Sequence, residues 1–400
     1  MISLLASASV WCIVVLCCIP PLHEPLRALL RPKVVKWVEQ TLPAVLRAQQ
    51  YQTHWLTTAF TWSSYSVSVP FYVTFLPTLI WVAEPQLGYR ATLLMGLCLY
   101  VGNGLKDLLC GPRPLAVSKQ AKLLAGSSLE VQTNAQEYGL PSSHTMNSLC
   151  LNYYIAHYLV QHGYLPGGTA TIILYVLVGV WVVWIGISRV YLGLHTPVDI
   201  VAGALAGAMV LTAYLSLDGR YDTWIRTNSF ATLVQGLGSV VLLRLHPKPL
   251  QHTPSYEFTA SFAGVCFGVV AGVNHSSLAG RQYFAQSYAL DMLASKQGLL
   301  HLLRRSCVGF FLVAAMKEFS KCMLLRSLPA VYRCVPVSLR LLWQPPVHSL
   351  HPGDPSCKGM PINAKGQPWD VDITARFISY ASIGWSVTEL TFLVCDALQW

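Results

Sequence analysis

The sequence predicts an all-α, polytopic membrane protein, a helical bundle of about 8–10 transmembrane spans with a polar site at one membrane face. Three observations support this fold class. The 400-residue chain is 54% hydrophobic and only 11% charged, whereas a soluble domain carries about 25% charged residues. Its mean hydropathy is +0.47. Apolar runs of the length that crosses a bilayer, about 20 residues, recur along the chain.

The candidate spans follow one another from the N-terminus. We expect the first run to be a span rather than a signal peptide, because no Lys or Arg precedes it and no small-residue cleavage site follows it. A later run, 306–326, is interrupted by Lys317, Glu318 and Lys321. The predicted spans are 3–20, 63–83, 91–110, 146–163, 169–190, 198–216, 229–245 and 257–276, with 306–326 and 374–395 as two further candidates.

The spans divide the chain into three predicted parts. Residues 1–62 hold the first span and a basic segment, 63–216 form a membrane core, and 217–400 add further spans and a Pro-rich loop. In the basic segment, Arg and Lys alternate with Leu, Val and Trp, which is typical of a helix lying on the membrane surface. We expect 115–137 to be a flexible loop and 342–368 an irregular excursion.

The net charge of +10 restricts the partners. Anionic lipid head groups or a phosphorylated substrate suit this charge. Nucleic acid does not, because no basic stripe with interleaved aromatic residues occurs in a soluble segment. No protein partner is evident from the sequence.

Three polar clusters interrupt the apolar sequence of the core. They read KDLLCGPRP from Lys106, PSSH from Pro141 and SRVYLGLHTPVD from Ser188. Successive spans cross the membrane in opposite directions, so the end of the third predicted span, the start of the fourth and the end of the fifth all lie on the same side of the membrane. The three clusters occupy these positions, and they therefore reach one membrane face. Polar residues at membrane depth are costly and usually functional. Small residues at 203–210 favour close helix packing next to the third cluster.

The clusters contain the groups needed to bind a phosphoryl group. Lys106, Arg113 and Arg189 are cations without obvious carboxylate partners, and Arg and Lys side chains bind phosphate oxygens. Ser142 and Ser143 precede a predicted helix start, where free backbone N–H groups bind anions. With these cations and no ligand cluster at metal spacing, we expect neither a metal nor another cofactor.

Two histidines in different surroundings complete the site. If the sixth span starts at Thr196–Pro197, His195 lies just outside it and Asp199 lies in its first turn. The carboxylate then holds one ring nitrogen and leaves the other free as a nucleophile. His144 has no carboxylate near it in sequence, which suits a general acid.

These residues resemble a known family. Lys106 to Arg113–Pro114, Pro141 to His144, and Ser188–Arg189 to His195 and Asp199 match the pattern K-x6-R-P, P-S-x-H and S-R-x5-H-x3-D of the lipid phosphate phosphatase (type 2 phosphatidic acid phosphatase) superfamily. Ser143 stands where many members have Gly. Further stretches at 68–77, 137–145 and 369–387 resemble sphingoid long-chain-base phosphate phosphatases, the sphingosine-1-phosphate phosphatase branch.

The resemblance implies metal-independent hydrolysis of sphingoid base 1-phosphates through a phosphohistidine, in the endoplasmic reticulum membrane. The alternatives are a broad phosphatase acting on phosphatidate or polyisoprenyl phosphates, and a non-catalytic lipid transporter or scramblase. A sphingoid base phosphate carries an ammonium group, for which we expect Glu137 and Tyr138 to be the binding residues. Asp107, beside Lys106, is expected to be neutralised by it. The sequence leaves open whether the site faces lumen or cytosol.

Overall fold

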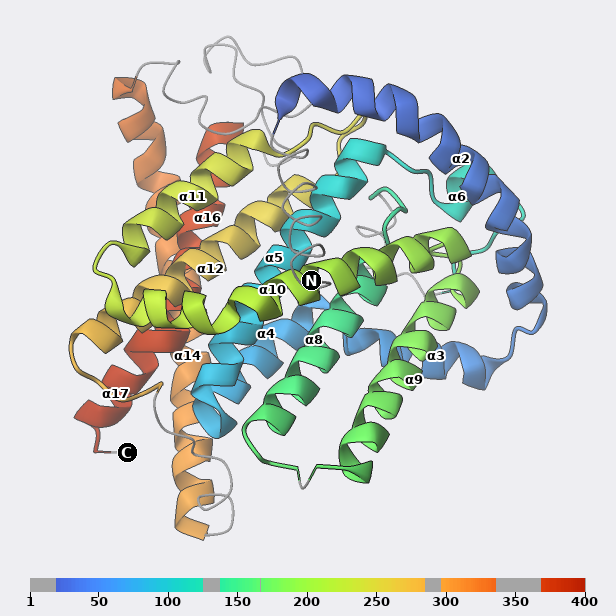
Figure 1. The fold of residues 1–400 in the computed structure, drawn as a ribbon. Coiled ribbons are helices and arrows are strands. Elements are labelled where there is room, and N and C mark those ends of the chain that lie inside the picture. The colour runs from blue at the N-terminus through green and yellow to red at the C-terminus, as the bar shows by residue number, and fades with distance from the viewer. Residues whose placement is uncertain (1–18, 125–136, 166, 285–295, 336–367, 400) are drawn as a thin grey trace. The chain divides into compact units, whose positions relative to one another are not determined.

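The computed structural model describes residues 19–124, 137–165, 167–284, 296–335 and 368–399, which form helices joined by connecting segments (Figure 1). The prediction of an all-helical fold is confirmed. The helices are α2 (Pro20–Gln50), α3 (His54–Tyr65), α4 (Val69–Thr78), η1 (Leu79–Ala83), α5 (Pro85–Leu109), α6 (Pro114–Val117), α8 (Ser143–Gln161), α9 (Thr169–Tyr191), α10 (Pro197–Thr227), α11 (Ala231–Leu245), α12 (Ser255–Leu278), α14 (Lys296–Cys334), α16 (Trp369–Trp385), η3 (Ser386–Leu390) and α17 (Thr391–Ala397).

Within the described residues, six helical segments are long and apolar enough to cross a membrane, or seven if α3 and α4–η1, bent by 50°, form one span. The protein is therefore a multi-pass membrane protein. The predicted span 3–20 lies mostly outside the described residues. Two other predicted spans become helices that fall short of these criteria: α11 has only 15 residues, and α8 buries polar residues such as Asn147 and Ser148.

The chain folds as two compact units. The first comprises the described residues of Met1–Val73, Leu97–Ser216 and Pro247–Ser255, and the second those of Thr74–Gly96, Leu217–His246 and Tyr256–Trp400. Helices α5 and α10 each contribute to both. The three-part division expected from the sequence stays a prediction, as do the loops at 115–137 and 342–368, which lie largely outside the described residues.

In the first unit, α2 packs through one narrow stripe. Its buried residues recur at spacings of four and seven, which places them on one side of a helix. They are His23, Arg27, Val34, Val38 and Val45. Arg27 donates to the carbonyls of Asp107 and Leu108, each at 3.0 Å. Those carbonyls belong to the last turn of α5, where the backbone supplies no further N–H donors within the helix. The buried arginine of α2 therefore caps the C-terminal end of α5 with hydrogen bonds.

The middle of α2 packs against residues that flank all three polar clusters. Val34 and Val38 form a buried apolar group with Leu140, just before Pro141. Residues packed around this group are Leu109, Val117, Val198 and Ala202. The basic segment expected only to lie on the membrane surface is thus also part of the first unit's core.

Helices α8 and α9 lie side by side (Figure 1) and α10 packs closely on α8 through small residues. A Cβ on Gly203 would lie 2.5 Å from the Ser142 carbonyl oxygen, and one on Gly207 would lie 3.2 Å from Met146 Cα and O. Backbones therefore touch where any side chain would separate the helices. The close packing predicted for 203–210 is confirmed.

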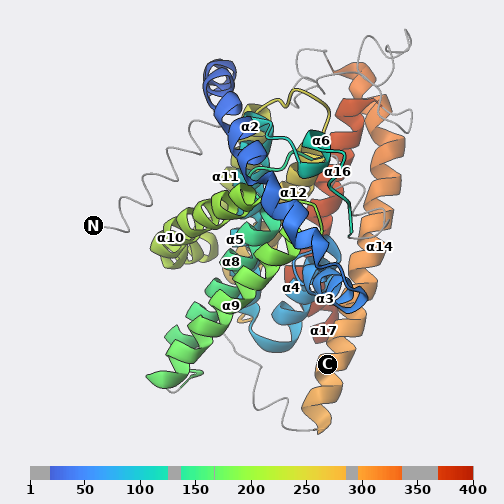
Figure 2. The same ribbon diagram turned by 90° about the vertical axis from the view of Figure 1, so that its right-hand side faces the viewer.

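The second unit has its own core. Helices α14 and α16 lie side by side (Figure 2), and α11, α12 and α16 share a cluster that includes Leu243, Tyr256 and Trp369. The fully buried Glu389 of η3 accepts hydrogen bonds from Ser276 and Arg281. The predicted span 306–326 lies within the continuous 39-residue α14, so its charged residues do not break the helix.

We predict that Gly203→Ala destabilises the protein. The new methyl group would force the Ser142 backbone away from α10, and overpacking of this kind costs about 1–3 kcal/mol. Gly219→Ala on the same helix is the matched control, because a Cβ there meets nothing within 4 Å. Thermal unfolding in detergent should give a lower melting temperature for Gly203→Ala and no loss for Gly219→Ala. Equal melting temperatures for Gly203→Ala and the wild type would contradict the tight contact.

Candidate active site

The three polar clusters of the sequence occupy helix ends of the first unit. Lys106 lies in the last turn of α5, and Arg113 directly precedes α6. Arg189 lies in the last turn of α9. Each cation is almost fully buried, with 2%, 5% and 4% of its surface exposed. Charged side chains pay a large desolvation penalty when buried, so their positions require nearby anionic or hydrogen-bonding groups.

Ser142 fixes the start of α8. It is the N-cap residue, and its Oγ accepts hydrogen bonds from Thr145 N at 3.5 Å and from Thr145 Oγ1 at 3.2 Å. Its own N–H donates to the Asp199 carbonyl at 3.0 Å. The first turns of α8 and α10 are thereby tied together. Ser142, expected to bind phosphate, uses these groups within the protein.

The turn between α9 and α10 positions His195. Gly193 has a φ of 78°, and a Cβ on it would lie 2.1 Å from the Lys122 carbonyl oxygen, so only glycine fits this left-handed position. The N–H groups of Leu194 and His195 then donate to the Arg189 carbonyl at 3.1 and 3.3 Å. The turn places His195 directly beside the end of the helix that carries Arg189.

His195 lies between an acid and a cation. Its Nδ1 is 3.6 Å from Asp199 Oδ2, and its Nε2 is 3.5 Å from Arg113 Nη1. Helix α10 begins at Pro197, so Asp199 lies in its first turn, and Asp199 Oδ2 also accepts from Thr196 N at 2.7 Å. The carboxylate is therefore held in place on one side of the ring, and Nε2 faces the guanidinium.

Burial lowers the pKa of His195 well below its ordinary value, and Arg113, Arg189 and Lys106 lower it further. The physical cause is that an imidazolium would add a positive charge to a site poor in water and rich in cations. His195 is consequently neutral at physiological pH. A neutral imidazole has a lone pair available for nucleophilic attack.

Arg113 links separate parts of the site through its guanidinium. Its Nε donates to the Glu137 carbonyl at 2.8 Å and its Nη1 to the Leu194 carbonyl at 2.7 Å. These two bonds fix the planar group beside His195.

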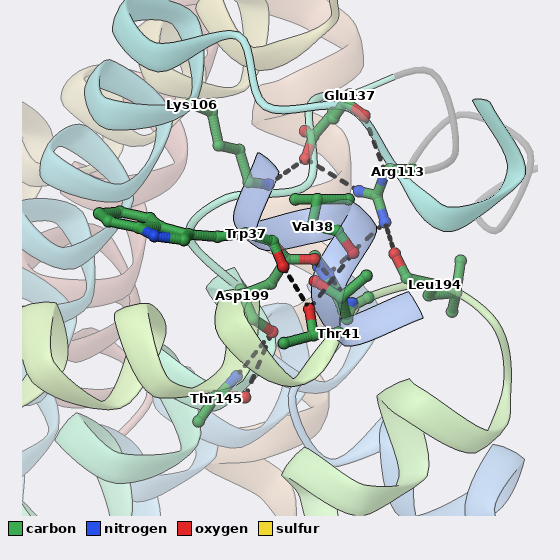
Figure 3. Close-up of polar contacts among 12 residues, drawn as sticks. Trp37, Val38, Thr41, Lys106, Arg113, Glu137, Thr145, Leu194 and Asp199 are labelled. Atoms are coloured by element: carbon green, nitrogen blue, oxygen red, sulfur yellow. Dashed lines mark hydrogen bonds and ion pairs between the residues drawn. The ribbon is translucent and has the colours of Figure 1, made fainter. Parts of the chain in front are cut away.

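The ion pairs of Glu137 with the cations of the site were not predicted from the sequence. Its carboxylate pairs with Lys106 and lies 4.0 Å from Arg113 Nη2. Figure 3 shows both cations pointing toward it. The expectation that Lys106 and Arg113 lack a carboxylate partner is therefore wrong. Asp107, expected to be neutralised by Lys106, accepts a hydrogen bond from Thr253 Oγ1 at 3.0 Å.

The second histidine and the second serine border the same cations. His144, partly exposed in the first turn of α8, lies near enough to Arg189, Lys106 and Arg113 to interact with them electrostatically. Ser143 Oγ is buried and has no hydrogen-bond partner among the described residues. A hydroxyl in that position is available to a ligand entering the site.

Tyr138 extends away from this group. Its hydroxyl accepts a hydrogen bond from Gln251 N at 3.2 Å, and burial, followed by the influence of Cys110, raises its pKa to about 12. It is held against the segment around Gln251 rather than bonded to the cations.

Sequence reasoning also missed the part that α2 plays. Val38 of α2, labelled in Figure 3, packs with Leu140 and Val198 next to the site. The heptad-like spacing of the buried residues of α2 was the signal that could have revealed this packing.

Within the described residues, no group of three or more His, Cys, Asp and Glu side chains is arranged to hold a metal ion.

Comparisons with known proteins find both a family model and a solved structure similar to this chain. The family model described as PAP2 superfamily matches residues 88–221, the range that contains the three clusters. A crystal structure of a PAP2 type phosphatidylglycerolphosphate phosphatase from Bacillus subtilis matches with a TM-score of 0.40 and 22% identity, over 54% of this chain and 96% of that one.

Curated relatives match over most of the chain. A protein of Schizosaccharomyces pombe named dihydrosphingosine 1-phosphate phosphatase is 24% identical, covering 91% of this chain and 90% of its own. Sphingosine-1-phosphate phosphatase 1 of Mus musculus is 24% identical over 80% of this chain and 67% of its own. Lipid phosphate phosphatase delta of Arabidopsis thaliana is 32% identical over 91% of this chain and 88% of its own. Because the Arabidopsis relative matches nearly the full length of both chains and the family model covers the three clusters, this chain belongs to the PAP2 superfamily and is a phosphatase of that family.

Proposed function

We propose that this phosphatase hydrolyses sphingoid base 1-phosphates to the free base and phosphate, without a metal, in the endoplasmic reticulum membrane. The observation that carries the chemistry is the neutral His195, set between Asp199 and Arg113 within a group of buried cations. The substrate class is supported by the names of the yeast and mouse relatives. The membrane location is supported by the apolar helices.

The reaction proceeds in two displacements. His195 Nε2 attacks phosphorus and the bond from phosphorus to the lipid oxygen breaks. Burial and the three cations lower the pKa of His144 in the free site; the bound phosphate offsets the cations, so that His144 is protonated in the complex and gives the lipid oxygen a proton. Water then attacks the phosphohistidine, His144 takes a proton from the water, and phosphate leaves as the bond to Nε2 breaks. Asp199, whose Oδ2 lies 3.6 Å from His195 Nδ1, stabilises the positive charge that the ring acquires in the attack. No metal takes part in either displacement.

The cations stabilise the charge of the transferred group. Lys106, Arg113 and Arg189 face the equatorial oxygens, because phosphoryl transfer depends mainly on positioning and on electrostatic stabilisation. The N-terminus of α8, with the Ser143 N–H, adds donors and a partial positive charge. Ser142 supports this site through its cap of α8.

A second candidate is a phosphatase of broad specificity for phosphatidate or polyisoprenyl phosphates. The name of the Arabidopsis relative favours it, since it specifies only a lipid phosphate.

Phosphate release from the purified protein separates the two candidates. In matched detergent micelles with excess EDTA, we expect dihydrosphingosine 1-phosphate to be hydrolysed with a kcat/KM at least about tenfold above that of phosphatidate. The same rate should be measured in Mg²⁺. Comparable kcat/KM values for both lipids would favour the broad phosphatase, and a tenfold loss of activity in EDTA would contradict the metal-free mechanism.

The two histidines should fail at different steps. His195→Ala should abolish turnover and any acid-labile phosphoenzyme, because no nucleophile remains. His144→Ala should still form phosphohistidine from an aryl phosphate, whose leaving group needs no proton. Trapping of the phosphoenzyme by acid quench measures the difference. Equal loss of phosphoenzyme in both variants would contradict this division of roles.

The pH profile should report the lowered pKa of His195. Because the folded site disfavours the imidazolium, the nucleophile stays neutral below its ordinary pKa of about 6.5, and kcat/KM should fall only at a lower pH. Arg189→Gln removes one of the cations that lower this pKa, so its acid limb should move to higher pH. An acid limb that stays in place in Arg189→Gln would assign it to the substrate phosphate instead.

A further inference from the structure

The carboxylate of Glu137 occupies the position between the cations that a phosphoryl group needs. It pairs with Lys106 and lies 4.0 Å from Arg113 Nη2 (Figure 3). The Lys106 and Glu137 side chains are 3% and 7% exposed, so water screens this pair little. A substrate phosphate that binds Lys106 and Arg113 must therefore displace an anion that is already there.

Displacement leaves Glu137 with a problem of charge. A buried carboxylate without a cation is strongly disfavoured, and removal of one partner from a buried ion pair is far more costly than loss of a surface contact. The backbone holds the residue in place, because its carbonyl accepts from Arg113 Nε at 2.8 Å. The carboxylate thus needs a new cation close to the phosphate.

Lipid phosphates differ in whether they supply that cation. A sphingoid base 1-phosphate carries an ammonium group on the carbon next to the one that bears the phosphate. Phosphatidate carries none, and neither does an N-acylated sphingoid base phosphate, in which the amine has become a neutral amide. Only the first brings both an anion for Lys106 and a cation for Glu137.

We propose that Glu137 determines specificity by an exchange of ion-pair partners. The substrate phosphate takes Lys106 and Arg113 from the carboxylate, and the substrate ammonium takes the carboxylate from Lys106. This inference rests on the proposed function and gives it a physical basis. Only a substrate with a zwitterionic head group leaves both Lys106 and Glu137 paired with an opposite charge. The exchange makes Glu137 a selective barrier against lipids with a phosphate alone.

The test combines a change in the enzyme with a change in the substrate. Dihydrosphingosine 1-phosphate, its N-acetyl derivative and phosphatidate are compared by kcat/KM in matched micelles. Wild type should prefer the free amine. Glu137→Gln keeps the backbone carbonyl and the side-chain shape but has no charge to re-pair. It should lower kcat/KM for the free amine and raise it for phosphatidate, so that their ratio falls by about tenfold or more.

A second readout needs no lipid. Inorganic phosphate competes for the same cations, so its inhibition constant should fall several-fold in Glu137→Gln, in which no carboxylate opposes it. Glu137→Asp retains the charge and should retain the preference for the amine. Glu39→Gln, an identical change at an exposed position of α2, is the matched control and should leave every ratio unchanged.

The outcomes separate this inference from the proposed function. A wild-type preference for the free amine that persists in Glu137→Gln would overturn the exchange and leave the proposed function intact. Equal losses of kcat/KM for all three lipids in Glu137→Gln would assign Glu137 a structural role and also overturn it. A wild-type enzyme with no preference among the lipids would overturn both. Opposite changes for the amine and for phosphatidate support the exchange.

Discussion

The burial of three cations within one site is the constraint on which the rest of this structure depends. Lys106, Arg113 and Arg189 repel one another where little water is present to screen them. The carboxylates of Glu137 and Asp199 lie among these groups and offset part of that charge. In the proposed mechanism, the cations that bind the phosphate also keep His195 neutral, as a nucleophile must be.

Helix ends supply nearly every group in the site, and this follows from their chemistry. The last turns of α5 and α9 carry Lys106 and Arg189, where cations interact favourably with the helix dipole. The first turns of α8 and α10 offer backbone N–H groups, and that of α10 also carries Asp199. The hydrogen bond from Ser142 N to the Asp199 carbonyl joins the first turn of α10 to the N-cap of α8.

Residues outside the proposed catalytic groups support these helix ends. Arg27 of α2 satisfies the last carbonyls of α5, and Val34 and Val38 pack beside Leu140. Gly203 allows the backbones of α8 and α10 to touch. Because each of these contacts fixes a backbone that carries a site residue, small changes in packing are expected to reach the chemistry.

The sequence by itself determined the helical fold, most span positions and the clusters that form the site. Charge-free apolar runs and helix-start residues are local signals, and α10 begins at Pro197 as its sequence indicates. Tertiary structure decided the partner of Lys106. Asp107 is its neighbour along the chain, yet Glu137, 31 residues away, makes the ion pair. The packing of α2 was likewise decided by contacts distant in sequence. Spacing along a chain predicts which residues share a helix face. An ion pair between residues on either side of a long loop forms only if the loop returns the chain to the right place, and no local sequence pattern encodes the path of the loop.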